Sequence, residues 1–201
     1  MARYAGGMAL TAQRKKLYLI VLVIGLVGVG AAYFIASQPT AQPRTAAKGE
    51  LSAYFSDEFK AVNKDKETLD KKLTVSEAEK VPEGLHNWIG QELTMEEMFP
   101  GGGVKLVAAG AAAVPGPGKS AHFKVGSDKG QMSLFIMKNW ESPKIGDADA
   151  YTLASRGLGA EAPPITIWRR GGLVYALVSN TPEGMGVLRQ ALGAPEPKKA
   201  Y

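Results

Sequence analysis

The segment ITIWRRGGLVYALVSN, residues 165–180, predicts two β-strands joined by a tight turn. Residues 165–170 and 173–180 are rich in β-branched, aromatic and other apolar side chains, which favour strands. Between them, Gly171 and Gly172 suit a two-residue hairpin turn, whose central residues take positive φ angles. The stretch therefore predicts a β-hairpin and, with it, an antiparallel sheet.

Signals on either side of this hairpin extend the sheet and add a helix. The segment TPEGMGVLRQAL, residues 181–192, predicts a closing helix, with Thr181 as its N-cap and Pro182 at its first position. Residues 139–164 predict a long and mostly irregular connection. Earlier strands are expected at residues 103–114, 120–125 and 131–137, with turn-forming segments between them. The pattern predicts an α+β fold, in which an antiparallel sheet of about five strands packs with helices on one side.

The most apolar part of the chain predicts a membrane anchor. The segment LYLIVLVIGLVGVGAAYFIA, residues 17–36, has no charged residue and is long enough, at about 1.5 Å per residue, to cross a bilayer as one helix. Arg14, Lys15 and Lys16 precede it directly, so the positive-inside rule places the N-terminus in the cytoplasm and the rest of the chain in the periplasm. A cleaved signal peptide is the alternative, although its cleavage sites would carry bulky residues at the −3 position. We expect a single-pass protein of a bacterial inner membrane.

One face of this predicted helix is lined by small residues, namely Gly25, Gly28, Ala32 and Ala36. Such faces allow helices to approach closely in lipid, where packing drives association. Glycine and alanine are also common in membrane helices that do not associate. Two interpretations of these small residues therefore stay open: a face that packs against another helix, or the ordinary composition of a membrane helix.

An amphipathic helical segment follows the anchor. Leu51, Phe55, Phe59 and Val62 recur every three to four residues, which places them on one face of a helix. Two interpretations stay open: this face packs against its own domain, or it binds a partner beside the membrane. The expected layout is a cytoplasmic tail (1–16), the transmembrane helix (17–36), a linker (37–50), the amphipathic helical segment (51–80), a periplasmic α+β domain (81–193) and a flexible tail (194–201).

Composition and charge exclude several classes of function. The chain has no cysteine, which excludes disulfides, thiolate metal sites and a cysteine nucleophile. The formal net charge is +5, but residues 1–43 contain four basic residues and no acidic one. The rest of the chain is nearly balanced and lacks the basic face that a nucleic-acid-binding protein needs.

The motifs that resemble chemical sites are incomplete. AVPGPGKS (113–120) resembles a phosphate-binding loop, but a strand rather than a helix is expected after it. His86 and His122 have no second ligand at a metal-binding spacing, and His122 is expected to face solvent. Asp147 and Asp149 form only a fragment of a calcium loop. We therefore expect no catalytic residue, no bound cofactor and no metal site, and no enzymatic activity.

Arg169 and Arg170 stand directly before the hairpin turn. Successive side chains of a strand point to opposite faces, so the two guanidinium groups are not expected to hold one anion together. One or both could pair with acidic residues of a partner, and a solvated hairpin tip is the alternative.

The pattern from Trp88 to Leu192 resembles the extracytoplasmic C-terminal domain of proteobacterial transmembrane anti-sigma factors. The similar stretches are LHNWIGQEL (85–93), GGGVKLVAAGAAAVPGPGKSAHFKV (101–125), GQMSLFIMK (130–138) and the hairpin at 165–180 with the helix after it. The resemblance implies a periplasmic α+β domain. Anti-sigma factors of this type also carry a cytoplasmic sigma-binding domain, often with zinc ligands, whereas residues 1–16 contain no cysteine or histidine. The resemblance therefore implies a domain type and its placement, and not sigma-factor regulation.

These features predict a non-catalytic accessory subunit. Its transmembrane helix and periplasmic domain would bind and stabilise a larger membrane-protein complex, with respiratory and photosynthetic complexes as hosts by analogy. The expected partners are subunits of that complex and the lipid bilayer, without nucleic acid and without a small-molecule substrate. The alternative is an anti-sigma-like envelope sensor or regulator.

Overall fold

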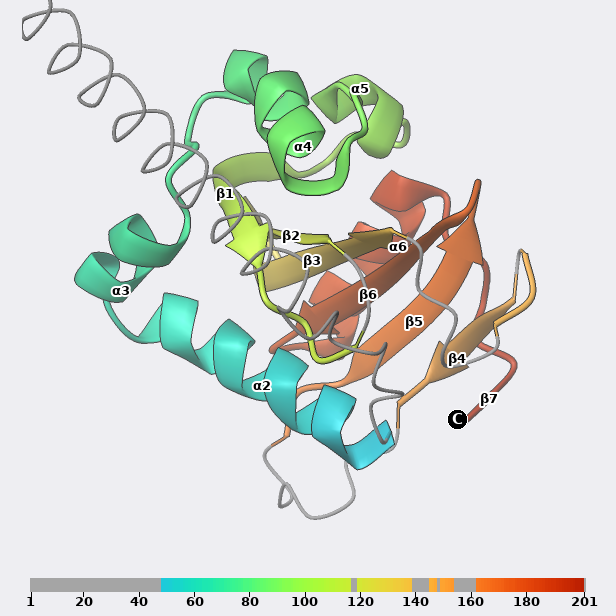
Figure 1. The fold of residues 1–201 in the computed structure, drawn as a ribbon. Helices are drawn as coiled ribbons and strands as arrows, with labels where there is room; N and C mark the ends of the chain where they lie inside the picture. The colour runs from blue at the N-terminus through green and yellow to red at the C-terminus, as the bar shows by residue number, and fades with distance from the viewer. Residues whose placement is uncertain (1–47, 117–118, 139–144, 148, 154–161, 201) are drawn as a thin grey trace, which may run out of the picture. The chain divides into compact units, whose positions relative to one another are not determined.

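The fold is seen in a computed structural model, which describes residues 48–116, 119–138, 145–147, 149–153 and 162–200 (Figure 1). The helical elements are α2 (Lys48–Lys64), α3 (Lys66–Lys72), the 3₁₀ turn η1 (Ala78–Lys80), α4 (Val81–Ile89), α5 (Met95–Met98) and α6 (Pro182–Leu192). The strands are β1 (Lys105–Ala112), β2 (Ser120–Ser127), β3 (Gly130–Lys138), β4 (Ala150–Thr152), β5 (Ile165–Arg170), β6 (Leu173–Ser179) and β7 (Lys199–Ala200).

The strands of the described residues form one sheet in the order β1-β2-β3-β6-β5-β4-β7. From β1 to β4, all neighbouring strands are antiparallel, and the short β7 runs parallel to β4. The α+β class is thus confirmed, with six antiparallel strands in the described part of the chain instead of about five. The extra strand, β4, lies inside the connection that we expected to be irregular. Its three residues are too few to give a clear period-2 pattern.

The hairpin at the centre of the prediction is confirmed. Arg170 faces Leu173 across the turn, and Gly171 and Gly172 have φ angles of 59° and 76°. Residues other than glycine rarely adopt such φ angles, which explains why two glycines occupy this turn. The closing helix is also confirmed, because the backbone N–H of Gly184 donates to the Thr181 hydroxyl.

Helices cover both faces of the sheet, in contrast to the one-sided packing that we expected. On one face, α4, α5 and α6 contribute to a buried cluster with Phe123, Leu134 and Trp168. On the other face, α2 packs over Phe135 and neighbouring residues, so that α2 and α6 lie on opposite sides of the sheet (Figure 1). The reason lies in the central strands: every residue of β6 is buried, and a strand that is apolar on both faces needs a cover on each.

The amphipathic helical segment supplies that second cover. Leu51 and Phe55 are fully buried, and Phe59 is 5% exposed. All three belong to the cluster on the α2 face of the sheet. Of the two interpretations of this apolar face, the structure supports packing against its own domain.

The last described residues, which belong to the segment expected as a flexible tail, make backbone contacts with β4. Lys199 and Ala200 pair with β4, and the Lys198 backbone N–H donates to the Ala150 carbonyl at 3.0 Å. The Lys198 ammonium also contacts the Asp149 carboxylate at 2.9 Å. Residues 199 and 200 thereby pair with the edge of the sheet that β4 would otherwise leave open.

The predicted anchor lies outside the described residues, together with the small-residue face and the basic residues that set its orientation. Among the helices that the structure does describe, none has the length and apolarity required to cross a membrane.

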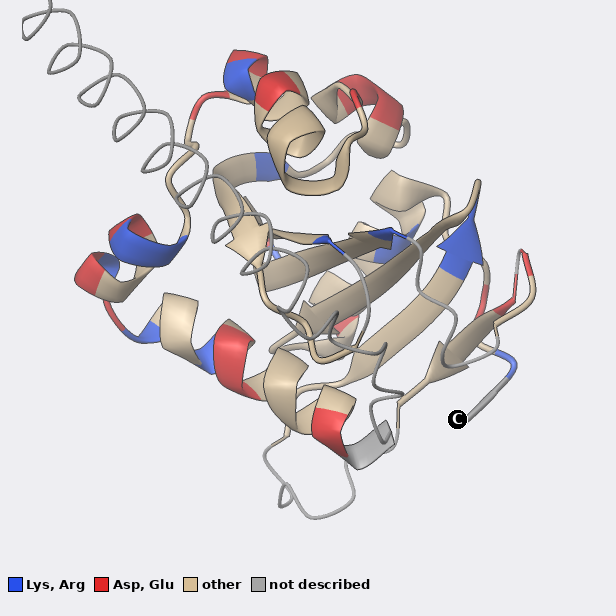
Figure 2. Cartoon of the chain, viewed as in Figure 1, with Lys and Arg blue, Asp and Glu red and all other residues tan. Residues whose placement is uncertain are grey.

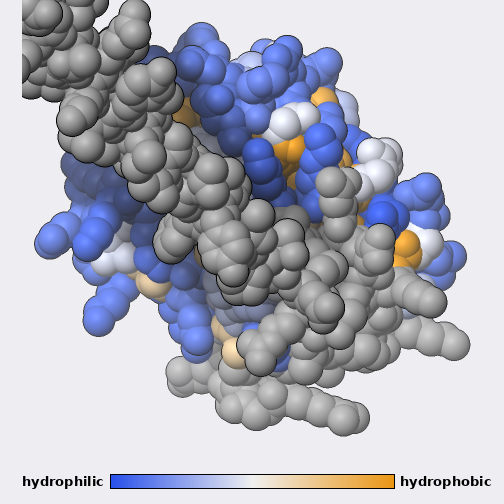
Figure 3. Space-filling view, in the orientation of Figure 1, coloured by the Kyte–Doolittle hydropathy of each residue, from blue (hydrophilic) through white to orange (hydrophobic). Residues whose placement is uncertain are grey.

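Charged residues of both signs occur along α2 and α3 (Figure 2). The face shown in Figure 3 is mainly hydrophilic in its described part. Within the described ranges, Val107 on β1 is the large hydrophobic side chain that is exposed, at 37%. The described residues thus expose no broad apolar patch.

Candidate functional site

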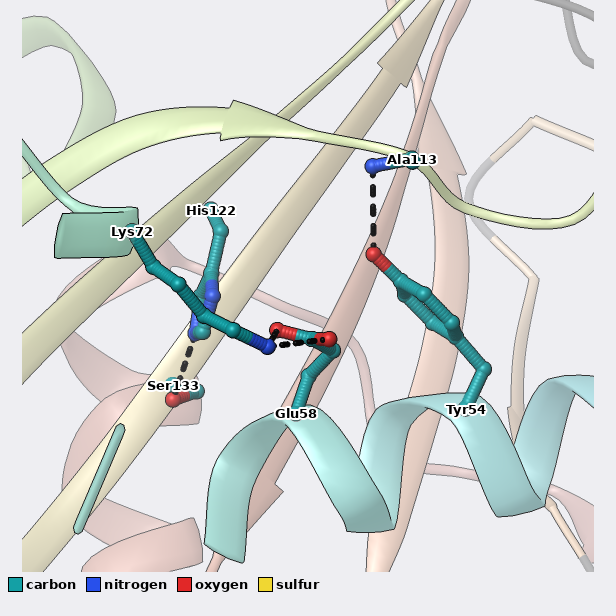
Figure 4. Close-up of polar contacts among 6 residues, drawn as sticks. All are labelled: Tyr54, Glu58, Lys72, Ala113, His122 and Ser133. Carbon is teal, nitrogen blue, oxygen red and sulfur yellow. Dashed lines mark hydrogen bonds and ion pairs between the residues drawn. The ribbon is translucent and has the colours of Figure 1, made fainter. Parts of the chain in front are cut away.

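A cluster of polar side chains lies between α2, α3 and the sheet. Tyr54 and Glu58 come from α2, Lys72 from α3, His122 from β2 and Ser133 from β3 (Figure 4). The cluster borders a pocket of about 270 Å³, lined by Tyr54, Glu58, Lys72, Leu73, Ala111, Ala112, Ala113 and His122. This pocket is the candidate functional site, because it gathers ionisable groups from elements far apart in the chain.

His122 forms the inner wall of the pocket and is 2% exposed. Its Nε2 shares a hydrogen bond of 2.9 Å with the hydroxyl of Ser133, and its ring stacks on Phe135. The expectation that His122 faces solvent is wrong. The alternation placed it correctly on the face opposite Phe123, but α2 covers that face.

Burial, followed by the positive charges of Lys72 and Lys124, lowers the pKa of His122 to about 3. The imidazole is therefore neutral at neutral pH, and it is a very weak base. In a hydrolytic Ser-His-Asp triad, a carboxylate stabilises the imidazolium that forms when the histidine takes the serine proton. Here the charges that act on the imidazole are cationic, and Ser133 is fully buried. The His122–Ser133 pair thus has the residue types of a catalytic dyad, but the charges around it disfavour the imidazolium that such a dyad must form.

Lys124 is a buried lysine beside this pair, with 8% of its surface exposed. Its Nζ donates to the carbonyl oxygen of Val62 at 3.0 Å. That carbonyl belongs to the last turn of α2, where helix carbonyls lack partners within the helix and attract cations. Burial lowers the pKa of the Lys124 ammonium. The contact links the end of α2 to β2.

Glu58 and Lys72 form an ion pair at the mouth of the pocket. Lys72 Nζ donates to both carboxylate oxygens of Glu58, at 2.7 and 2.9 Å. The two side chains keep 24% and 39% exposure, so water screens the pair and its contribution to stability is small. The pair links α2 to α3 and places one charge of each sign beside the same cavity.

Tyr54 stands one helical turn before Glu58 and closes the other side of the pocket (Figure 4). Its hydroxyl oxygen accepts a hydrogen bond from the Ala113 N–H at 3.1 Å. Burial, and then the negative charge of Glu58, raise the pKa of Tyr54 to about 12. The phenol therefore stays protonated, and its hydrogen is available to an acceptor.

The residues that the sequence singled out do not join this site, apart from His122. Arg170 donates to the Leu192 carbonyl at 2.9 Å, at the end of α6, and its guanidinium lies 5.9 Å from the centre of the Tyr175 ring. Arg169 lies on the same strand and forms an isolated parallel β-bridge with Asp147. A partner contact through either arginine stays a prediction.

His86 and the acidic loop also lie elsewhere. His86 pairs with Glu92 at 3.0 Å on the surface. Asp149 is paired with Lys198, and over the described ranges no group of three histidine or acidic residues is placed to hold a metal ion. After the segment that resembles a phosphate-binding loop comes a strand, β2, as expected.

Sequence reasoning missed Tyr54, Glu58, Lys72 and Ser133. These residues come from three elements that meet only when α2 folds onto the sheet, so no fixed spacing joins them. The available signal was the apolar stripe of α2, because a helix that covers the second face would bury the alternate residues of β2, including His122.

Comparison of the chain with protein-family models, with curated proteins and with solved structures finds no match. The function must therefore be inferred from the chemistry of the chain's own residues.

Proposed function

We propose that this protein is a non-catalytic, single-pass accessory subunit that binds and stabilises a larger membrane-protein complex. The observation that carries the proposal is the uncharged segment 17–36, preceded by Arg14, Lys15 and Lys16 and followed by a folded domain. Such a chain holds one domain at one face of a membrane and offers one helix to neighbouring helices.

The chemistry of the polar cluster supports a role without catalysis. A general base works best when its pKa lies near the working pH, and His122 lies far below it. Its hydroxyl partner, Ser133, has no exposed surface from which to reach a substrate. The cluster is better suited to binding or to internal structure than to bond breaking.

The test is purification of the tagged full-length protein from its native membrane in mild detergent, with mass spectrometry of the proteins that stay bound. We expect the subunits of one large membrane complex at a fixed ratio. A sigma factor or a signalling protein in their place would favour the alternative, an anti-sigma-like sensor. Recovery of the protein alone would contradict the proposal.

A matched pair of variants tests the predicted helix face. Gly28→Leu adds a bulky side chain to the face that also holds Ala32, whereas Gly30→Leu makes the same change about 200° around the helix, at about 100° per residue. We expect Gly28→Leu to release the complex and Gly30→Leu to retain it. Equal retention by both variants would remove this face from the interface.

A further inference from the structure

The outer edge of β1 has an uncovered position that opens into the pocket. In an antiparallel strand, every second residue directs its N–H and C=O away from the paired neighbour. Ala109 directs both groups outward: its N–H donates to the Val75 carbonyl at 2.6 Å, and its carbonyl accepts from the Val75 N–H at 2.9 Å. The N–H of Ala113, four residues on, donates to the Tyr54 hydroxyl. Ala111 lies between these two covered positions and, by the same alternation, directs its N–H and C=O outward.

Ala111 is exposed and lines the pocket. Leu73, which ends α3, and Tyr54 line the same pocket, so the open stretch of edge is short. A strand of a partner could not run through it, because Val75 and Tyr54 already occupy the edge on both sides. The position therefore suits a small molecule that satisfies one N–H and one C=O.

The side chains around Ala111 also offer both hydrogen-bond donors and acceptors, and two of them are charged. Lys72 supplies a cation, and the protonated Tyr54 supplies a hydroxyl hydrogen that no described residue accepts. Glu58 supplies an anion whose two oxygens can accept further hydrogen bonds. A simple anion would be attracted by Lys72 and repelled by Glu58, and a simple cation would meet the reverse. A ligand that carries both charges complements both groups.

We propose that this pocket binds a small zwitterion of the α-amino-acid class. The carboxylate accepts hydrogen bonds from the Ala111 N–H, the Tyr54 hydroxyl and the Lys72 ammonium. The α-ammonium donates to the Ala111 carbonyl and to Glu58. The neutral ring of His122 forms the inner wall beside the α-carbon. A volume of about 270 Å³ holds an amino acid with a short side chain such as glycine or alanine. This inference is independent of the proposed function, and the sequence patterns gave no reason to expect such a ligand.

The test is isothermal titration of the full-length protein in detergent with glycine and alanine, and with acetate and methylammonium, which carry one charge each. We expect at least one of the two amino acids to bind. Each single-charge compound should bind with an affinity lower by about tenfold or more, because it leaves half of the groups in the pocket unpaired. Acetate or methylammonium binding as tightly as the amino acids would overturn the proposal. Absence of binding by both amino acids would overturn it as well.

Neighbouring residues provide matched controls. Lys72→Met and Glu58→Gln each remove one charge from the pocket, while Lys71→Met and Asp57→Asn make the same changes at exposed positions that do not line it. We expect the first two variants to weaken amino-acid binding by about tenfold or more, and the controls to bind as the unchanged protein does. Circular dichroism shows whether each variant is folded. Unchanged binding by folded Lys72→Met and Glu58→Gln variants would contradict the proposal.

Discussion

The imidazole of His122 stacks on the ring of Phe135, with 4.0 Å between the ring centres and 20° between the ring planes. This pair belongs to the apolar layer between the sheet and α2, so a titratable group lies within a hydrophobic core. Its Nε2 shares a hydrogen bond with the Ser133 hydroxyl, and burial and the charges of two lysines disfavour its protonated form. The folded domain therefore buries a histidine in its neutral form.

The first prediction concerns the pH dependence of stability. The pKa of His122 is about 3 in the folded protein and about 6.5 when the chain is unfolded. Between these values the unfolded state binds a proton that the folded state does not bind. The free energy of unfolding should therefore fall as the pH falls from about 6.5 towards 3, by at most about 1.4 kcal/mol per pH unit from this residue.

Urea unfolding at several pH values between 7 and 5 measures this slope before most carboxylates titrate. His122→Gln should flatten the slope, whatever its effect on stability at pH 7. His86→Gln removes the exposed histidine and serves as the control. If His122→Gln keeps the full slope of the unchanged protein, His122 is not the group responsible.

The second prediction concerns the contact between α3 and β1. A Cβ atom at Gly110 would lie 2.5 Å from the carbonyl oxygen of Lys72 and 3.1 Å from the Cα of Leu73. Gly110→Ala should therefore push α3 away from the sheet and lower the free energy of unfolding by about 1–3 kcal/mol. It should also weaken ligand binding in the pocket, because Lys72 moves with α3.

Gly126→Ala is the matched control for this change. Gly126 pairs with Lys105 at the other end of the β1–β2 ladder, and its added Cβ would meet only Val107 Cγ2, at 3.7 Å. Its effect on stability should stay within about 0.5 kcal/mol. Equal melting temperatures for the two variants would argue against close packing of α3 on β1.

The third prediction concerns the N-cap of α6. The Thr181 hydroxyl accepts from the Gly184 N–H at 3.0 Å and donates to the Lys129 carbonyl at 2.9 Å. Thr181→Ala should lower the free energy of unfolding by about 1 kcal/mol, because it removes the cap of the helix and its link to the β2–β3 turn. Thr181→Ser keeps the hydroxyl and should retain most of the stability. Urea unfolding of the two variants measures these changes. An equal loss of unfolding free energy in both would assign the effect to the methyl group of Thr181 and not to its hydroxyl.

The fourth prediction separates binding from folding in the Glu58–Lys72 pair. The pair is partly exposed, so its loss should change the free energy of unfolding by less than about 1 kcal/mol. Thermal unfolding of Lys72→Met should therefore resemble that of the unchanged protein, even where amino-acid binding is lost. A large destabilisation would mean that the pair mainly holds α3 in place.

Short sequence patterns were sufficient to predict the structure where a single turn, or the alternation of residues along one strand, determines it. Gly171 and Gly172 specify their turn because few other residues adopt its φ angles, and Thr181 with Pro182 specifies the start of α6. The alternation in β2 also placed His122 on the correct face. In each case the responsible interactions lie within a few residues of the chain.

Which faces are covered and which side chains meet depends on contacts between distant segments of the chain. Local patterns were enough to predict β1, β2, β3, β5 and β6, the hairpin, the closing helix and the amphipathic character of α2, but not the short strands β4 and β7. They did not determine that α2 lies over His122, that Val75 and Tyr54 cover the edge of β1 on either side of Ala111, or that Glu58 reaches Lys72 fourteen residues later. These contacts join segments that are distant in the chain. They exist only because both apolar faces of one sheet must be removed from water, a requirement of the whole domain rather than of any short stretch.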